Sequence, residues 1–122
     1  MKVLGIRWCQ VSSDAEALAG FLGTEGLGIT PRDLGMPADA GFHGAVLPAG
    51  EGSWMEFWPS GEGMGEMTML QIVVDDADAF AANARNNGLD PQGPTDAHGE
   101  RIYMLTAPNG QQVSFQSKLG SA

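Results

Sequence analysis

Residues 53–59 alternate between two kinds of side chain, a pattern typical of a β-strand. Successive side chains of a strand point to opposite faces, so Trp54, Glu56 and Trp58 are expected to share one face. A carboxylate between two indoles suits neither a solvated face nor a hydrophobic core. The pattern therefore predicts the wall of a pocket, where aromatic surface holds a ligand and the acid orients it. The alternative is an edge strand with a solvated Glu56 between two half-buried tryptophans.

The first half of the chain is predicted to have the element order β-α-β-β-β. A strand pattern over residues 2–11 is followed by Ser13 and Glu16, whose spacing is typical of a capping box at the start of a helix. The apolar side chains of this helix form one stripe, which consists of Ala15, Leu18, Phe21 and Leu22. Three strands are predicted after the helix, at residues 29–34, 42–48 and 53–59. Pro31 indicates an edge position for the first of them.

The second half is predicted to repeat this order. Its strands are predicted at residues 67–74, 91–95, 99–106 and 112–117. Its helix follows Asp75 or Asp76, either of which is a suitable cap. An offset of 62 residues aligns identical residues of the two halves, among them Val11 with Val73, Asp14 with Asp76, Gly26 with Gly88 and Leu27 with Leu89. We therefore expect one α+β domain over residues 1–122 with a duplicated unit, module one at 1–60 and module two at 66–119.

The composition argues against several classes of partner. The chain has 122 residues and a formal net charge of −9, which argues against nucleic acid and against anionic membrane surfaces. No apolar run approaches the roughly 20 residues that a membrane helix needs. Cys9 is the single cysteine, so no internal disulfide can form and a reducing cytoplasm is the expected location. The expected partners are a small organic molecule and a second copy of the chain.

Two stretches of the sequence resemble the vicinal oxygen chelate superfamily, which includes glyoxalase I, the bleomycin resistance proteins and the extradiol dioxygenases. Residues 21–28 are similar to the family's aromatic-rich helix followed by Leu-Gly. Residues 99–113 are similar to its Gly-x-Arg strand, Asp-Pro-x-Gly turn and last strand, with Ala107 where Asp is usual. The resemblance implies two tandem β-α-β-β-β modules, whose cupped and mostly antiparallel sheets carry helices on the outer face.

In the metalloenzymes of this superfamily, four inward residues hold a divalent ion, and Glu56 matches the ligand that closes the first module. The other three positions fall on side chains that are poor ligands or none: Ile6 or Arg7, Met69 and Ser114. We therefore expect no metal ion and no cofactor at this place, as in the family's metal-free binding members. A relocated metal site that uses His43, Glu56 and His98 is the alternative.

Strand parity and the resemblance together predict the side chains that face the pocket. These are Trp8, Gln10, Trp54, Glu56, Trp58, Met67, Met69, Gln71, Ile102, Met104 and Ser114. The register of the first strand stays open, because a slip of one residue would turn Arg7 and Cys9 inward in place of Ile6 and Trp8. Indoles, thioethers and amides suit a flat or conjugated ligand.

The Glu56 carboxylate needs compensation if no metal ion is bound, because burial of a bare charge is costly. Three solutions are open: Glu56 is protonated, it pairs with Arg7, or it receives a cationic or hydrogen-bond-donating ligand. A fourth interpretation is purely structural, with Glu56 bonded to Gln10 or Gln71 and the tryptophans filling the core of a dimer.

These observations favour a protein that binds a flat or cationic small organic molecule without metal, in an aromatic pocket at the interface of a homodimer. The alternative is a lyase or isomerase of the glyoxalase type, or a dioxygenase, that uses Glu56 as a base or as part of the relocated metal site. A third interpretation is an accessory module that pairs with a larger partner. Whether any reaction is catalysed stays open at this point.

Overall fold

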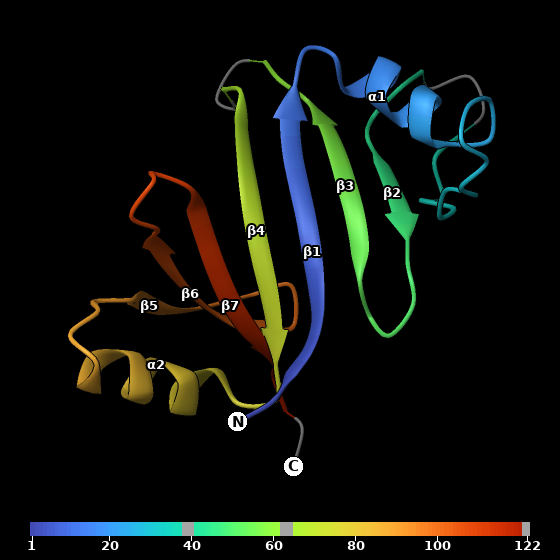
Figure 1. Cartoon of the computed structure of the whole chain (residues 1–122). Coiled ribbons are helices and arrows are strands. Elements are labelled where there is room, and N and C mark those ends of the chain that lie inside the picture. Colours follow the sequence, from blue (N-terminus) through green and yellow to red (C-terminus); the bar gives the residue numbers. More distant parts are fainter. Residues whose placement is uncertain (38–40, 62–64, 121–122) are drawn as a thin grey trace. The chain divides into compact units, whose positions relative to one another are not determined.

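A computed structural model describes residues 1–37, 41–61 and 65–120. Its elements in chain order are β1 (Val3–Ser12), α1 (Ala15–Leu22), β2 (Ala45–Pro48), β3 (Trp54–Pro59), β4 (Met67–Val74), α2 (Ala77–Asn86), β5 (Gln92–Ala97), β6 (Glu100–Thr106) and β7 (Gln112–Lys118) (Figure 1). The chain divides into two compact units, one formed by Arg7–Thr68 and the other by Met1–Ile6 with Met69–Ala122. The α+β class predicted from the sequence is confirmed. None of the helices is long and apolar enough to span a membrane within the described residues.

In the Arg7–Thr68 unit, β3 lies between β2 and β1. Strand β1 runs parallel to β3 and β2 runs antiparallel to it. Helix α1 covers one face of these strands, where Ala15, Leu47 and Phe57 are buried together. Because Phe57 points to α1, its neighbours Glu56 and Trp58 point to the opposite face. This unit therefore has one face packed against a helix and another that carries the predicted site.

The start of α1 differs from the prediction. Its N-cap is Asp14, whose side chain makes no capping hydrogen bond, and the predicted capping box of Ser13 and Glu16 is wrong. The backbone N–H of Ser13 instead donates to Oε1 of Glu66 at 2.8 Å. Phe21 is 65% exposed and lies outside the apolar stripe, whereas Ala15 is buried as predicted.

The strand predicted at residues 29–34 is absent, although this segment is fully described. A backbone hydrogen bond joins it to the edge of the sheet, from the N–H of Arg32 to the carbonyl of Val46 at 2.8 Å. Pro31 has no N–H to donate, which works against a continuous ladder. The first module is therefore β-α-β-β rather than the predicted β-α-β-β-β.

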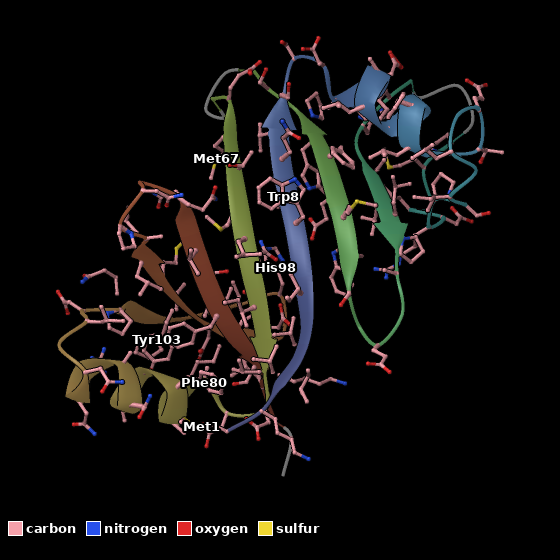
Figure 2. All side chains as sticks on the ribbon, in the orientation of Figure 1. Met1, Trp8, Met67, Phe80, His98 and Tyr103 are labelled. Atoms are coloured by element: carbon pink, nitrogen blue, oxygen red, sulfur yellow. The ribbon has the colours of Figure 1, made fainter. Side chains whose placement is uncertain are left out.

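In the second unit the strand order is β4-β7-β6-β5, and the predicted β-α-β-β-β order is confirmed. Helix α2 begins at the N-cap Asp76, whose side chain accepts a hydrogen bond from the N–H of Ala79 at 3.1 Å. The core of this unit consists of Val74, Ala77, Ala81, Tyr103 and Phe115, with Phe80 packed against it. Figure 2 shows Phe80 on α2 and Tyr103, which belongs to β6, beside this helix.

Each unit joins its first strand to its last strand in parallel, β1 with β3 and β4 with β7, and places its helix between the two in sequence. The two units thus share this topology, and the duplication inferred from the sequence stays a prediction. Strand β1 contributes to both units, because its residues up to Ile6 belong with the second half of the chain. There the N–H of Asp75 donates to the carbonyl of Lys2 at 3.1 Å, and the N–H of Lys2 donates to Oδ1 of Asp75 at 2.9 Å.

Candidate functional site

The Glu56 carboxylate is bound by the two tryptophans beside it on β3. The indole Nε1–H of Trp54 donates to Oε2 of Glu56 at 2.6 Å, and that of Trp58 donates to Oε1 at 3.0 Å. All three side chains are half-buried and share one face, as the alternation predicts. Since β3 is flanked by strands on both sides, the alternative of an edge strand is wrong. Each carboxylate oxygen thus has a donor from its own strand, an arrangement that the sequence analysis did not foresee.

The register of β1 is the second of the two that the sequence left open. Arg7 pairs with Trp54 and Cys9 pairs with Glu56, so both lie on the Glu56 face. Trp8 pairs with Met55 and therefore points to the α1 face of the sheet, where it is 36% exposed (Figure 2). The same register pairs Gln10 with Phe57. The expectation that Trp8 and Gln10 face the pocket together with Glu56 is wrong, because a shift of one residue exchanges the two faces.

Two arginines lie over the ring of Trp54. The guanidinium carbon of Arg7 is 3.9 Å from the ring centroid, and that of Arg32 is 4.7 Å from it. Both distances are typical of cation–π contacts. Arg7 comes from the neighbouring strand β1, whereas Arg32 comes from the irregular segment held beside Val46. The sequence analysis considered Arg7 as a partner of Glu56 but gave Arg32 no role.

The Trp58 indole packs on Gly44, the residue that precedes the neighbouring strand β2. A Cβ built on Gly44 would lie 2.1 Å from Cε3 of the Trp58 indole, so only a residue without a side chain fits there. Gly44 also has a φ of 134°, which disfavours other residues. The backbone of residue 44 therefore forms a support for the Trp58 ring.

Cys9 carries a protonated thiol at neutral pH. Burial, followed by the nearby negative charge of Glu56, raises the pKa of the thiol from 9.0 to about 11. Since the thiolate is the form that attacks electrophiles and binds metals, Cys9 is poorly suited to both roles. Cys9 therefore supplies no activated sulfur nucleophile to the Glu56 face.

The second unit presents a polar face opposite to α2. The register of β4, β6 and β7 places the predicted residues Met69, Gln71, Ile102, Met104 and Ser114 together on this face. Ser114 is only 1% exposed, and its hydroxyl donates to Oε1 of Gln116 at 2.7 Å. The amide of Gln116 donates onward to Oε1 of Glu100 at 3.3 Å. Gln116 and Glu100 complete this row of polar groups, and the hydrogen bond between Ser114 and Gln116 follows from their i, i+2 spacing on one strand.

Three predicted site residues lie apart from these two groups. Met67 begins β4 and is exposed (Figure 2). His43 precedes β2, and His98 lies in the turn between β5 and β6 with a φ of 53°. Within residues 1–37, 41–61 and 65–120, no three His, Cys, Asp or Glu side chains lie close enough to hold a metal ion. His43 and Glu56 belong to the Arg7–Thr68 unit, whereas His98 belongs to the other unit.

This arrangement of two helices and mixed strands is the fold of the glyoxalase/bleomycin resistance/dioxygenase superfamily, and it confirms the predicted fold. A superfamily member from Vibrio splendidus 12B01 matches with a TM-score of 0.63 at 15% identity, over 93% of this chain and 97% of its own. Methylmalonyl-CoA epimerase from Mycobacterium tuberculosis matches with a TM-score of 0.60 at 17% identity, over 95% of this chain and 87% of its own.

A catechol 2,3-dioxygenase has a higher TM-score of 0.65 at 14% identity, and the match covers 97% of this chain but 42% of that one. No protein-family model and no curated protein matches the sequence. At such low identities the solved structures establish the fold alone, and the activity has to be argued from the site.

Proposed function

We propose that this protein binds a small, flat organic molecule without a metal ion, on the face of β3 that carries Trp54, Glu56 and Trp58. The pair of indole hydrogen bonds to Glu56 supports this most directly. These bonds fix both aromatic rings before a ligand arrives, and a preorganised surface loses less entropy on binding. They also occupy one acceptor site on each carboxylate oxygen, which leaves Glu56 less available to a cation.

Binding without catalysis is favoured by the chemistry of the same face. A general base needs an accessible, proton-accepting oxygen, whereas both Glu56 oxygens already accept an N–H. Cys9 is protonated and supplies no nucleophile. The likeness to an epimerase and to a dioxygenase keeps an enzyme that uses Glu56 as a base as the alternative.

The remaining predicted lining residues stay a prediction. They are Met67 on the first unit, and Met69, Gln71, Ile102, Met104 and Ser114 on the second. A single domain over residues 1–122 likewise remains our proposal. Trp8 and Gln10 are not part of the proposed site, because they point to the other face of β1.

We further propose that two copies of the chain associate through an apolar stripe on β1. Leu4, Ile6 and Trp8 alternate along this strand and are 51%, 49% and 36% exposed. Contiguous exposed apolar side chains are a typical interaction surface. The stripe lies on the face of β1 opposite to Arg7 and Cys9. The contact between copies would therefore be separate from the ligand face, rather than enclosing it as the sequence analysis expected.

Sedimentation velocity tests the dimer. The protein should sediment as a dimer, and Ile6→Glu should convert it to a monomer. Thr95→Glu, on the exposed strand β5, places the same charge away from the stripe and should leave the dimer intact. A monomeric parent protein, or an Ile6→Glu dimer, would reject this surface.

Titration calorimetry with a panel of planar aromatic compounds tests the ligand site, in the presence and absence of EDTA. We expect saturable binding that EDTA does not change, and a loss of about tenfold in affinity for Trp58→Leu. Phe21→Leu removes an exposed aromatic ring of α1 and serves as the matched control. Binding that requires added metal, or no binding by any planar compound, would contradict the proposal.

A further inference from the structure

We propose that the ligand carries an anionic group, such as a carboxylate or a phosphate, and that Arg32 and Arg7 bind this group beside Trp54. This inference rests on the proposed function and adds the charge of the ligand to it. It comes from the convergence of two guanidinium groups on one indole.

The two arginines reach Trp54 from different segments. Arg7 is directly paired with Trp54 in the β1–β3 register, whereas Arg32 is anchored by its own backbone N–H to Val46. Val46 in turn pairs with Glu56 across β2 and β3. Arg32 is thus fixed at both ends, by a backbone hydrogen bond at the sheet edge and by its guanidinium on the indole. Such fixed geometry is what a binding residue needs.

Two of the few basic residues of this acidic chain meet at one side chain. The protein has a net charge of −9 and only six Lys and Arg residues, yet two of the six meet at Trp54. Two carboxylates lie near them: Glu56 accepts from the Trp54 indole, and Asp33 lines the hollow beside Arg32, where its Oδ1 accepts the N–H of Gly35. The anion would therefore be recognised by direct contact with the two guanidinium groups, and the neighbouring carboxylates would limit how strongly it binds.

The orientation of a stacked guanidinium suits this role. Stacking on the ring uses the flat face of the guanidinium, while its N–H donors lie in the plane and point outward. Those donors match the two oxygens of a carboxylate or a phosphate in a bidentate contact. A cationic ligand at the Trp54 ring would instead be repelled by the positive charges of Arg7 and Arg32.

A hollow next to Arg32 offers room for the rest of the ligand. Its volume is about 240 Å³, and its lining includes Arg32, Asp33, Leu34, Phe42 and Gly44. Gly44 is also the residue that supports the Trp58 ring. The hollow therefore brings apolar side chains, the Arg32 guanidinium and the glycine under the Trp58 ring together at one edge of the sheet. This combination suits a ligand ring that carries one anionic group.

The test uses four naphthalene compounds of one shape: 2-naphthoate, 2-naphthyl phosphate, 2-naphthamide and 2-naphthylmethylammonium. Calorimetry on the full chain should show that the anions bind about tenfold or more tightly than the amide, with an advantage that shrinks as salt is raised. A preference for the phosphate over the carboxylate would assign the anion as a phosphate. Equal affinities of all four would overturn the anionic subsite while leaving the flat-ligand site standing, whereas no binding at all would reject the proposed function itself.

Arg32→Gln should remove most of the preference for the anions, measured as the ratio of the affinities for 2-naphthoate and 2-naphthamide. Arg32→Lys keeps the charge but loses the planar donors, so it should retain part of the preference. Arg85→Gln is the matched control, because Arg85 lies over Tyr103 in the other unit and should affect neither affinity. Tighter binding of the ammonium compound, or an unchanged anion preference in folded Arg32→Gln, would overturn the inference.

Discussion

The indole of Trp58 fills the space in which a side chain at Gly44 would begin, with 2.1 Å between Cε3 of the ring and the position of a Cβ. This contact joins β3 to the residue that precedes β2. The position of the Trp58 ring therefore depends on Gly44. A search of the sequence for reactive or ligand-binding side chains would not select this residue, because glycine has none.

Gly44→Ala is expected to lower the free energy of unfolding by about 2 kcal/mol or more. The new methyl group overlaps the Trp58 ring, and the φ of 134° disfavours any side chain. Urea denaturation followed by tryptophan fluorescence measures the change. Gly50→Ala lies in open space and should stay within about 0.5 kcal/mol of the parent. Equal stabilities of the two variants would show that the ring does not lie on Gly44.

Glu56→Gln is expected to lower the free energy of unfolding by about 1–3 kcal/mol. An amide has one acceptor oxygen, so one of the two indole N–H groups would lose its partner and face an NH₂ donor instead. The emission spectrum of the folded protein should shift as well, because both tryptophans change their surroundings. Glu25→Gln, which removes the same charge from an exposed turn, should change neither quantity.

The stability of the protein is expected to fall as the pH rises from 9.0 to about 11. The folded pKa of the Cys9 thiol is raised, mainly by burial, so the unfolded chain ionises first and the ionised form favours unfolding. Cys9→Ser should show a smaller loss of stability over this pH range. At pH 8 the thiol should react with iodoacetamide more slowly than free cysteine does, and a faster reaction would contradict the burial of Cys9.

Tyr103→Phe is expected to raise the pKa of Asp78 and to leave that of Asp96 unchanged. The Tyr103 hydroxyl donates to Oδ1 of Asp78 at 2.5 Å and is the main reason for the lowered pKa of that carboxyl, with Arg101 second. For Asp96 the main cause is the hydrogen bond from Arg101. Carbon-detected NMR titration of both carboxyl groups measures the two values.

The sign of the stability effect follows from these lowered pKa values. A carboxyl group whose folded pKa is depressed stabilises the protein above its unfolded pKa of 3.8, and this contribution is lost as the pH falls through the folded value. Tyr103→Phe should therefore lose less stability than the parent as the pH falls below 3.8. A steeper loss in the variant would contradict the assignment.

Much of the second half could be predicted because its patterns are strong. A strand was predicted at residues 67–74 and a helix cap at Asp75 or Asp76, and the structure has β4 and the N-cap Asp76 at these places. In the first half, by contrast, a capping box that is well formed in sequence is not formed in space, since the N–H of Ser13 bonds to Glu66 instead. A local signal was overridden there by a contact between residues distant in sequence.

The site was predicted in its residues but not in its internal bonding. Trp54, Glu56 and Trp58 were placed on one face correctly, because alternation along a strand needs no tertiary information. The register of β1 could not be decided, since Ile6 and Trp8 or Arg7 and Cys9 each give a plausible face and only the pairing with β3 selects one. Arg32 was missed because it lies on no regular element and reaches Trp54 from beyond β2.

The sharing of β1 between the two units has a consequence for the order in which the chain folds. The unit formed by Met1–Ile6 and Met69–Ala122 is discontinuous in sequence, and its two parts are joined by contacts such as the hydrogen bonds between Lys2 and Asp75. Contacts of such large sequence separation form slowly. The Arg7–Thr68 unit is continuous in sequence, so it is expected to form first.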